Sequence, residues 1–272
     1  MGSIYEKAKS TLPAPIRKAI RGAVGGELAA RLKLARQAVA RPHAQPEPVH
    51  EAVHQLLNEV RIEGIVRKAL RKFAALKGRK NLKLHLGAGP DTRTGWVNID
   101  LALMLVPEVD GVKQPDTVFI NYDLRRGLPL EDASCSYIYS SHFFEHLEYR
   151  HVKQLLRECY RVLEPGGVFR LCLPNFKGMF AAYLRGDEEF FSLLNILQVL
   201  PELEPGTETL VDHVNYGVYQ NGEHKWIMDE EKIKVLLTHT GFASVAESSF
   251  QEDIDRDMEL RRRYSFYVDA FK

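Results

Sequence analysis

The sequence of 272 residues has no uninterrupted apolar run of about 18 residues, the minimum for a membrane-spanning helix. Its N-terminal residues also lack an apolar stretch between their charges, so no secretory signal is predicted. With 45% hydrophobic and 27% charged residues, the composition is that of a globular protein. We therefore expect a cytoplasmic protein.

Cysteine is also scarce. Cys135, Cys159 and Cys172 stand singly, with no CxxC spacing, and their number is odd. Neither a disulfide framework nor a cysteine zinc site fits this pattern. We expect three buried, reduced thiols, as is usual in cytoplasmic proteins.

Charge is unevenly distributed, although the net charge is only +1. Residues 1–80 hold 17 Lys and Arg against 6 Asp and Glu, whereas residues 81–272 hold 20 against 30. The basic, roughly amphipathic residues 1–40 fit an arm that folds on its own domain or on a sister subunit of a homo-oligomer. An alternative is peripheral contact with an anionic membrane at its inner face. Nucleic acid is disfavoured as a partner, because no stacking aromatics are interleaved with the basic residues.

Prolines divide the chain near residue 48. Pro42, Pro46 and Pro48 predict a linker, so we assign residues 1–48 to a basic helical arm and linker and residues 49–272 to the main domain. The main domain begins with apolar residues three and four apart from Val49 to Leu76. This spacing predicts a long amphipathic helix that packs on the sheet that follows.

Strand and helix patterns alternate through the rest of the chain, which predicts an α/β fold with a mostly parallel sheet and helices on both faces. The main helix is expected from Tyr149 to Leu163, ended by the Glu164-Pro165-Gly166-Gly167 turn. The predicted strands are Leu82–Leu86, Trp96–Asp100, Thr117–Asn121, Ser136–Ser140, Val168–Leu173, Ser244–Phe250 and Tyr264–Phe271.

The connection between the first two predicted strands is unusually short. Only residues 87–95 separate them, fewer than a crossover with its own helix normally needs. Either the crossover helix is reduced to a turn, or the two strands are placed differently.

This short connection has the residues expected of a nucleoside site. Gly87 and Gly89 follow the first strand, and Asp100 ends the second. Without Cβ atoms, the glycines allow left-handed backbone and close approach of a ligand. A carboxylate at the tip of the next strand can accept hydrogen bonds from a ribose diol.

Several stretches resemble motifs of the class I S-adenosylmethionine-dependent methyltransferases, in the family's order and spacing. LHLGAGPD resembles the glycine-rich first motif, and GWVNID resembles the second strand with its ribose-binding acid. DLRRGLPLEDASCSYIYSSHFFEHL, from Asp123, resembles the adenine-contacting segment and fourth strand. RECYRVLEPGGVFRLCLPN, from Arg157, resembles the following helix, turn and fifth strand, and HKWIMDEEKIKVLLTHTGF, from His224, resembles the late helix.

The resemblance implies a Rossmann-like class I methyltransferase fold: a seven-stranded, mostly parallel sheet with a helical N-terminal extension and a lid insertion after the fifth strand. It implies S-adenosylmethionine as cofactor and S-adenosylhomocysteine as product. Asp100 would hold the ribose and Asp123 the adenine, although turn or capping roles stay open for both. The residues expected to contact the cofactor are Gly87, Ala88, Gly89, Asp100, Asp123 and Leu124. A dinucleotide is a weaker alternative, because GAGPDTRTG lacks the third glycine of GxGxxG at its required place.

Methyl transfer to a hydroxyl needs a base near the cofactor. His142 directly follows the fourth predicted strand, at the sheet edge where ligands bind in open α/β sheets. His146 is a second candidate, with helix capping as its alternative role. His213, in the lid, is a third.

Residues 176–226 depart from the strand–helix alternation and are predicted to form the substrate lid. We expect two helices in it, one rich in Phe and Tyr and one apolar from Phe190 to Leu197. A metal shared by His213, His224 and Asp212 lacks the right spacing, so no metal site is predicted. The candidate substrate-binding residues are polar or aromatic, as in sugar sites, although a lid core satisfied by its own hydrogen bonds is the alternative: Asn175, Tyr183, Asn215, Tyr216, Tyr219, His224, Lys225 and Trp226.

The short crossover and the sequences GWVNID and FYVDA resemble a bacterial branch of the family that commonly accompanies glycan biosynthesis. Fold alone does not fix function. The leading hypothesis is O-methylation of a saccharide or glycan-linked hydroxyl. The alternatives are N- or C-methylation of a small metabolite and a catalytically silent, methyltransferase-like binding protein.

Overall fold

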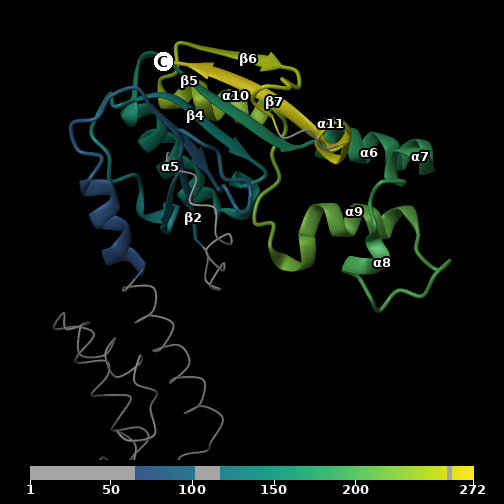
Figure 1. Cartoon of the computed structure of the whole chain (residues 1–272). Coiled ribbons are helices and arrows are strands. Elements are labelled where there is room, and N and C mark those ends of the chain that lie inside the picture. Colours follow the sequence, from purple (N-terminus) through teal and green to yellow (C-terminus); the bar gives the residue numbers. More distant parts are fainter. Residues whose placement is uncertain (1–64, 102–116, 256–258) are drawn as a thin grey trace, which may run out of the picture. The chain divides into compact units, whose positions relative to one another are not determined.

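The computed structural model describes residues 65–101, 117–255 and 259–272 (Figure 1). The chain divides into two compact units, Met1–Ala74 and Ala75–Lys272. In the first unit residues 65–74 are helical, which confirms this part of the predicted amphipathic helix. The predicted arm over residues 1–48 lies outside the described residues. Within the described ranges, no helix has the length and apolarity to span a membrane.

A seven-stranded sheet is the centre of the second unit, and its strand order is β3-β2-β1-β4-β5-β7-β6 (Figure 1). Strands β1 to β5 pair in parallel, and β7 pairs antiparallel with both β5 and β6. The predicted mostly parallel α/β sheet is confirmed. The strands are β1 (Leu82–Leu86), β2 (Val97–Asp100), β3 (Val118–Asn121), β4 (Cys135–Ser141), β5 (Leu163–Pro174), β6 (Ser244–Ser248) and β7 (Ser265–Phe271).

Helices α5 (Tyr149–Val162) and α10 (Glu230–Thr240) pack against each other and against the sheet. The buried residues of α5 recur three and four apart, and they include Val152, Leu155 and Leu156. This spacing places them on one face of the helix, so their burial holds α5 on the strands. The predicted helix from Tyr149 is confirmed to within one residue of its end.

The connection from β1 to β2 contains no helix. The two strands are parallel neighbours, and Leu84 lies beside Val97 and Leu86 beside Ile99. Because β2 begins beside Leu84, the connection has to return along β1 by only about two residues. A turn is long enough for this return. Gly87 and Ala88 both donate to the Ile99 carbonyl, at 2.9 and 3.2 Å, which ties the start of this turn to β2.

The prediction for the start of β5 is wrong. The strand begins at Leu163 and includes the Glu164-Pro165-Gly166-Gly167 segment. This segment is irregular: Cys135 pairs with Leu163 and Tyr137 with Val168, so β5 has extra residues between the two pairs. Gly166, with a φ of +79°, takes the left-handed backbone that this irregularity requires. Its amide donates to the Lys272 carbonyl at 2.9 Å, so the final residue pairs with it.

A buried arginine stands in the middle of β5. Arg170 is fully buried and forms ion pairs with Asp255 at 2.5 Å and Asp269 at 2.8 Å. Its guanidinium also donates to Ser248 Oγ and to the Ser249 carbonyl. The charge is therefore compensated by two carboxylates from outside its own strand.

The insertion after β5 has a hydrophobic core of its own, made by Phe176, Met179, Ala182 and Phe191 with half-buried apolar neighbours. Its predicted apolar helix from Phe190 to Leu197 is wrong, because one helix ends at Phe191 and another begins at Ile196. The elements of the insertion are α6 (Phe176–Arg185), α7 (Glu188–Phe191), α8 (Ile196–Val199), α9 (Leu210–Tyr219) and η3 (Gln220–Gly222). The remaining short helices are η1 (Leu124–Arg126), η2 (Phe144–His146) and α11 (Glu259–Tyr264).

Candidate active site

Strands β1 and β4 meet where the strand order reverses, and ligands of open α/β sheets bind outside the carboxyl ends of strands at such a point. The residues after the two strands touch. A Cβ added to Gly87, just after β1, would lie 2.3 Å from Cγ of Phe143, just after β4. The glycine turn and the segment after β4 therefore line one site.

The carboxylate of Asp100 is held in place by main-chain donors at the end of β2. Its Oδ2 accepts from the Gly89 amide and its Oδ1 from the Leu101 amide, both at 2.6 Å. The side chain is only half-buried, and each carboxylate oxygen keeps further acceptor capacity. An orientated acceptor beside a bare glycine turn fits the ribose of a nucleoside cofactor.

Asp123 caps η1, the short helix that begins at Leu124. Its carboxylate accepts from the Arg125 amide at 3.0 Å and from the Arg125 guanidinium at 2.8 Å through both oxygens. Burial opposes ionisation, but the hydrogen bonds from Arg125 outweigh it, so the pKa of Asp123 is lowered. Most of the acceptor capacity of Asp123 is thus used within the protein, and the adenine contacts of Asp123 and Leu124 stay predictions.

A buried carboxylate lies among the histidines after β4. Glu145, in η2, is 1% exposed, and its Oε1 lies 3.6 Å from His142 Nδ1 and 4.0 Å from His146 Nε2. Both distances exceed a hydrogen bond. Burial raises the pKa of Glu145 to about 8. The backbone at His142 is left-handed, with a φ of +48°, which turns the chain from the strand into this cluster.

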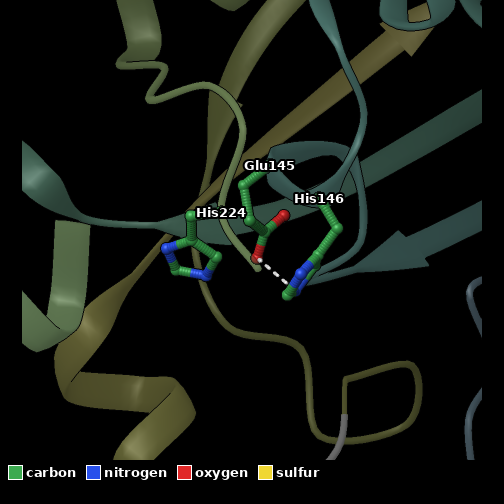
Figure 2. Close-up of side chains that lie close together, drawn as sticks. All are labelled: Glu145, His146 and His224. Atoms are coloured by element: carbon green, nitrogen blue, oxygen red, sulfur yellow. Dashed lines mark ion pairs between the residues drawn. The ribbon is translucent and has the colours of Figure 1, made fainter. Parts of the chain in front are cut away.

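The end of the insertion brings a third imidazole to the same place. The rings of His146 and His224 are 4.9 Å apart between centroids, and Figure 2 shows Glu145 drawn with the two rings. The amides of Lys225 and Trp226 donate to the Glu145 carbonyl at 2.8 and 3.2 Å. Main-chain hydrogen bonds therefore fix the returning chain against η2.

Comparison with known proteins agrees with this geometry. Residues 92–171, from the first crossover into β5, match a family described as a methyltransferase domain. The seven-stranded mixed sheet with flanking helices is consistent with the Rossmann-like fold of such a domain. The fold is that of a class I methyltransferase. The matched domain and the sheet order support S-adenosylmethionine as the cofactor.

Solved structures of methyltransferases are similar to this chain at low identity. A SAM-dependent methyltransferase from Archaeoglobus fulgidus has 18% identity and a TM-score of 0.45, over 77% of this chain and 94% of that one. Phosphoethanolamine N-methyltransferase 2 from Haemonchus contortus has 14% identity and a TM-score of 0.42, over 76% and 52%. A methyltransferase from Mesorhizobium loti has 16% identity and a TM-score of 0.42, over 74% and 95%. No curated protein matches the sequence.

Within this methyltransferase fold, His142 is well anchored. Its Nε2 lies 2.8 Å from Ser265 Oγ in β7, and its amide donates to the Cys172 carbonyl at 2.9 Å. Burial lowers the pKa of His142 well below the usual value. Glu145 faces Nδ1 of the ring, and Ser265 is bound to Nε2. Both ring nitrogens therefore face groups of the protein, so the ring is better placed to orientate these side chains than to contact the methyl-accepting substrate.

Two other predicted site residues have contacts elsewhere. His213, on α9, stacks on Phe191 with 5.3 Å between ring centroids, and the structure does not bring it into the Glu145 cluster. Asn175 caps α6 by accepting from the Gly178 amide at 2.7 Å. Roles of His213 in catalysis and of Asn175 in substrate binding stay predictions.

Aromatic side chains near the cluster are accessible. Trp226 stacks on Tyr149 at 4.7 Å and is still 40% exposed. Tyr183 and Tyr219 are also exposed, whereas the Lys225 ammonium is bound to the Gly222 carbonyl. Among the remaining predicted substrate-binding residues, Asn215 is exposed and Tyr216 half-buried. The Trp226 amide donates to the Glu145 carbonyl at 3.2 Å, so the main chain of Trp226 lies beside the cluster.

Glu145 was not predicted as a site residue from the sequence, whereas His142, His146 and His224 were. A signal for it was present. Glu145 is a charged residue between apolar Phe144 and Leu147, directly after a buried strand, where a carboxylate is costly unless it has a role.

Proposed function

We propose that this chain is an S-adenosylmethionine-dependent methyltransferase that methylates a hydroxyl group of a saccharide or glycan-linked acceptor. The observation that carries the proposal is the contact between the glycine turn after β1 and the segment after β4 that holds Glu145 and the histidines. When bound, the cofactor supplies a methyl group on a sulfonium that an acceptor takes by in-line displacement.

The protein contributes mainly by placing the two reactants. The turn at Gly89 leaves its main chain uncovered beside Asp100, which would accept from the ribose hydroxyls, whereas Phe143 fills the space beside Gly87. Fixing two reactants in line can supply about 7 to 11 kcal/mol of the barrier. Most of the catalysis is therefore attributed to this placement.

The reaction also releases a proton. An acceptor hydroxyl that takes the methyl group would lose its proton, and an imidazole of the cluster would accept that proton. His146 is the best placed, because its side chain is 30% exposed, against 17% for His142. General-base help of this kind contributes about 10²- to 10⁴-fold.

The preference for a saccharide is supported by the aromatic surface beside the cluster. Trp226 presents an exposed ring that is held rigid by stacking on Tyr149. A fixed aromatic face next to polar groups suits a sugar, which has apolar ring faces and a polar rim. Residues 1–40 are proposed to contact an anionic membrane carrying such acceptors, or a second copy of the chain.

Titration calorimetry with S-adenosylmethionine and S-adenosylhomocysteine tests the cofactor. Wild-type protein should bind both, and Asp100→Asn should weaken binding about 10- to 100-fold, because charge-assisted hydrogen bonds contribute about 1.5 to 3 kcal/mol. Asp132→Asn is the matched control, since Asp132 is exposed and pairs with Arg161 on α5. Absence of binding by the wild type would overturn the proposal in favour of a silent binding protein.

The acceptor class is tested by transfer of labelled methyl to nucleotide sugars, glycolipids, small amines and phenols. Methylation of a sugar hydroxyl is expected. Transfer only to nitrogen or carbon of small metabolites would replace the saccharide assignment while leaving the methyltransferase assignment intact.

A further inference from the structure

The Glu145 carboxylate is the starting point for a second proposal. It is buried, and neither of its oxygens has a hydrogen-bond partner on any other described residue. A buried carboxylate without partners is strongly unfavourable unless a proton or a cation compensates it. Both oxygens therefore have free acceptor capacity inside the protein.

Two imidazoles converge on this carboxylate. Donor atoms of Glu145, His146 and His224 all lie within 4.8 Å of one another. Zinc bonds to nitrogen and oxygen are about 2.0 to 2.2 Å long, which sets tetrahedral ligands about 3.3 Å apart. The three donor atoms would therefore have to move closer together for one ion to bind all of them.

The tautomer of His224 is fixed in the form that a metal needs. Its Nδ1 lies 2.8 Å from the Gly217 carbonyl, which can only accept, so Nδ1 must donate. In a neutral ring this leaves Nε2 unprotonated with a free lone pair. Metal-binding histidines usually donate their other nitrogen to a carbonyl or carboxylate in this manner.

The three residues are also held together before any ion binds. Glu145 and His146 are consecutive in η2, and the Lys225 and Trp226 amides donate to the Glu145 carbonyl, which anchors the chain next to His224. A rigid backbone on both sides lowers the cost of ordering the ligands.

We propose that Glu145, His146 and His224 form a binding site for one divalent transition-metal ion of the zinc class. Two imidazoles and one carboxylate suit zinc better than magnesium, which prefers oxygen ligands and water. Three protein ligands leave a fourth position open. The site goes beyond the proposed function, because metal binding depends on these side chains and not on methyl transfer.

The metal would change one step of the proposed reaction. With the ion in place, His146 is a ligand and no longer a base. The ion would be held by Glu145, His146 and His224, and it would supply Lewis acidity that makes a nearby acceptor hydroxyl easier to deprotonate by solvent water.

The test uses the full chain, stripped with EDTA, and Zn²⁺ or Mg²⁺ alone in titration calorimetry. One Zn²⁺ per chain should bind, and Mg²⁺ should not. Glu145→Gln and His224→Ala should each weaken Zn²⁺ binding by more than about 100-fold, since loss of a residue that only supports a ligand already costs about 10- to 100-fold. His239→Ala, an exposed histidine on α10, should leave binding unchanged.

Equal Zn²⁺ affinity in the wild type and in folded Glu145→Gln and His224→Ala proteins would overturn the site. Thermal unfolding shows whether each variant is folded, and Co²⁺ absorption in the visible range gives a second readout on wild-type protein that needs no variant. Binding of S-adenosylhomocysteine is measured in parallel. If S-adenosylhomocysteine binds and Zn²⁺ does not, the metal site is wrong and the proposed function stands. If Zn²⁺ binds and S-adenosylhomocysteine does not, the proposed function is wrong and the metal site stands.

Discussion

The buried side chain of Asn98 in β2 holds the main chain of Arg93 at both its donor and its acceptor. Asn98 Oδ1 accepts from the Arg93 amide at 2.8 Å, and Asn98 Nδ2 donates to the Arg93 carbonyl at 3.0 Å. The Arg93 guanidinium lies over the Tyr139 ring, 4.0 Å from its centroid. One amide side chain thus fixes the turn that takes the place of a crossover helix.

Asn98→Ala should destabilise the protein by about 2 to 4 kcal/mol, because it removes both hydrogen bonds and leaves main-chain groups of the turn unpaired. Denaturant unfolding followed by circular dichroism measures this. Asn215→Ala, at an exposed position on α9, is the control and should change stability little. Equal stability of Asn98→Ala and wild type would show that Asn98 does not hold the turn.

Gly87→Ala should lower the free energy of unfolding more than Gly186→Ala does. Both glycines have left-handed φ, +67° and +68°, but a Cβ at Gly87 would clash with Phe143, whereas nothing lies within 4 Å at Gly186. Backbone strain alone costs about 1 to 2 kcal/mol, and overpacking adds about 1 to 3 kcal/mol. Thermal unfolding compares the two variants, and adding Phe143→Gly, which removes the clashing Cβ as well as the ring, should restore part of the lost stability at Gly87 only. Similar losses for both variants would contradict the contact.

Arg170→Met should destabilise the fold by about 3 to 5 kcal/mol, because it leaves the buried Asp255 and the half-buried Asp269 without their cation. Adding Asp255→Asn and Asp269→Asn should restore part of that loss. Urea midpoints measured on the single and triple variants check this. A triple variant less stable than Arg170→Met would refute the charge explanation.

The pair of Glu158 and Arg161 on α5 should make stability depend on pH. Hydrogen bonds from Arg161 lower the pKa of Glu158 below its unfolded value. The contribution of ionised Glu158 to folding stability is then fully present above the unfolded pKa of about 4.3. It is lost as the pH falls through the lower pKa of the folded state. The stability difference between wild type and Glu158→Gln should therefore shrink from pH 6 to pH 3. In an Arg161→Gln background this pH dependence should largely disappear.

Local sequence patterns predicted the sheet well. Apolar runs located the buried strands such as β1 and β5, and the three- and four-residue spacing located α5, because both signals report which face of an element is buried; β6, SVAES, has no buried residue. The start of β5 was predicted wrongly, because Pro165 and the two glycines after it are typical of a turn. In the structure, pairing with β4 and with Lys272 keeps this segment in the sheet.

Contacts between distant segments could not be predicted in the same way. His146 and His224 were each candidates, but their meeting depends on how the insertion returns to η2. The pairing of Arg170 with Asp255 likewise joins residues from separate parts of the chain. Periodicity contains no information on such pairings, so the candidate site emerged only from the fold.

The insertion packs its helices around its own core and rejoins the sheet through two amides that donate to the Glu145 carbonyl. Those two hydrogen bonds involve only main-chain atoms on both sides, so they impose no requirement on side-chain identity. This junction with η2 can therefore stay in place when the side chains at Lys225 and Trp226 change, and the glycine turn and Asp100 lie outside the insertion.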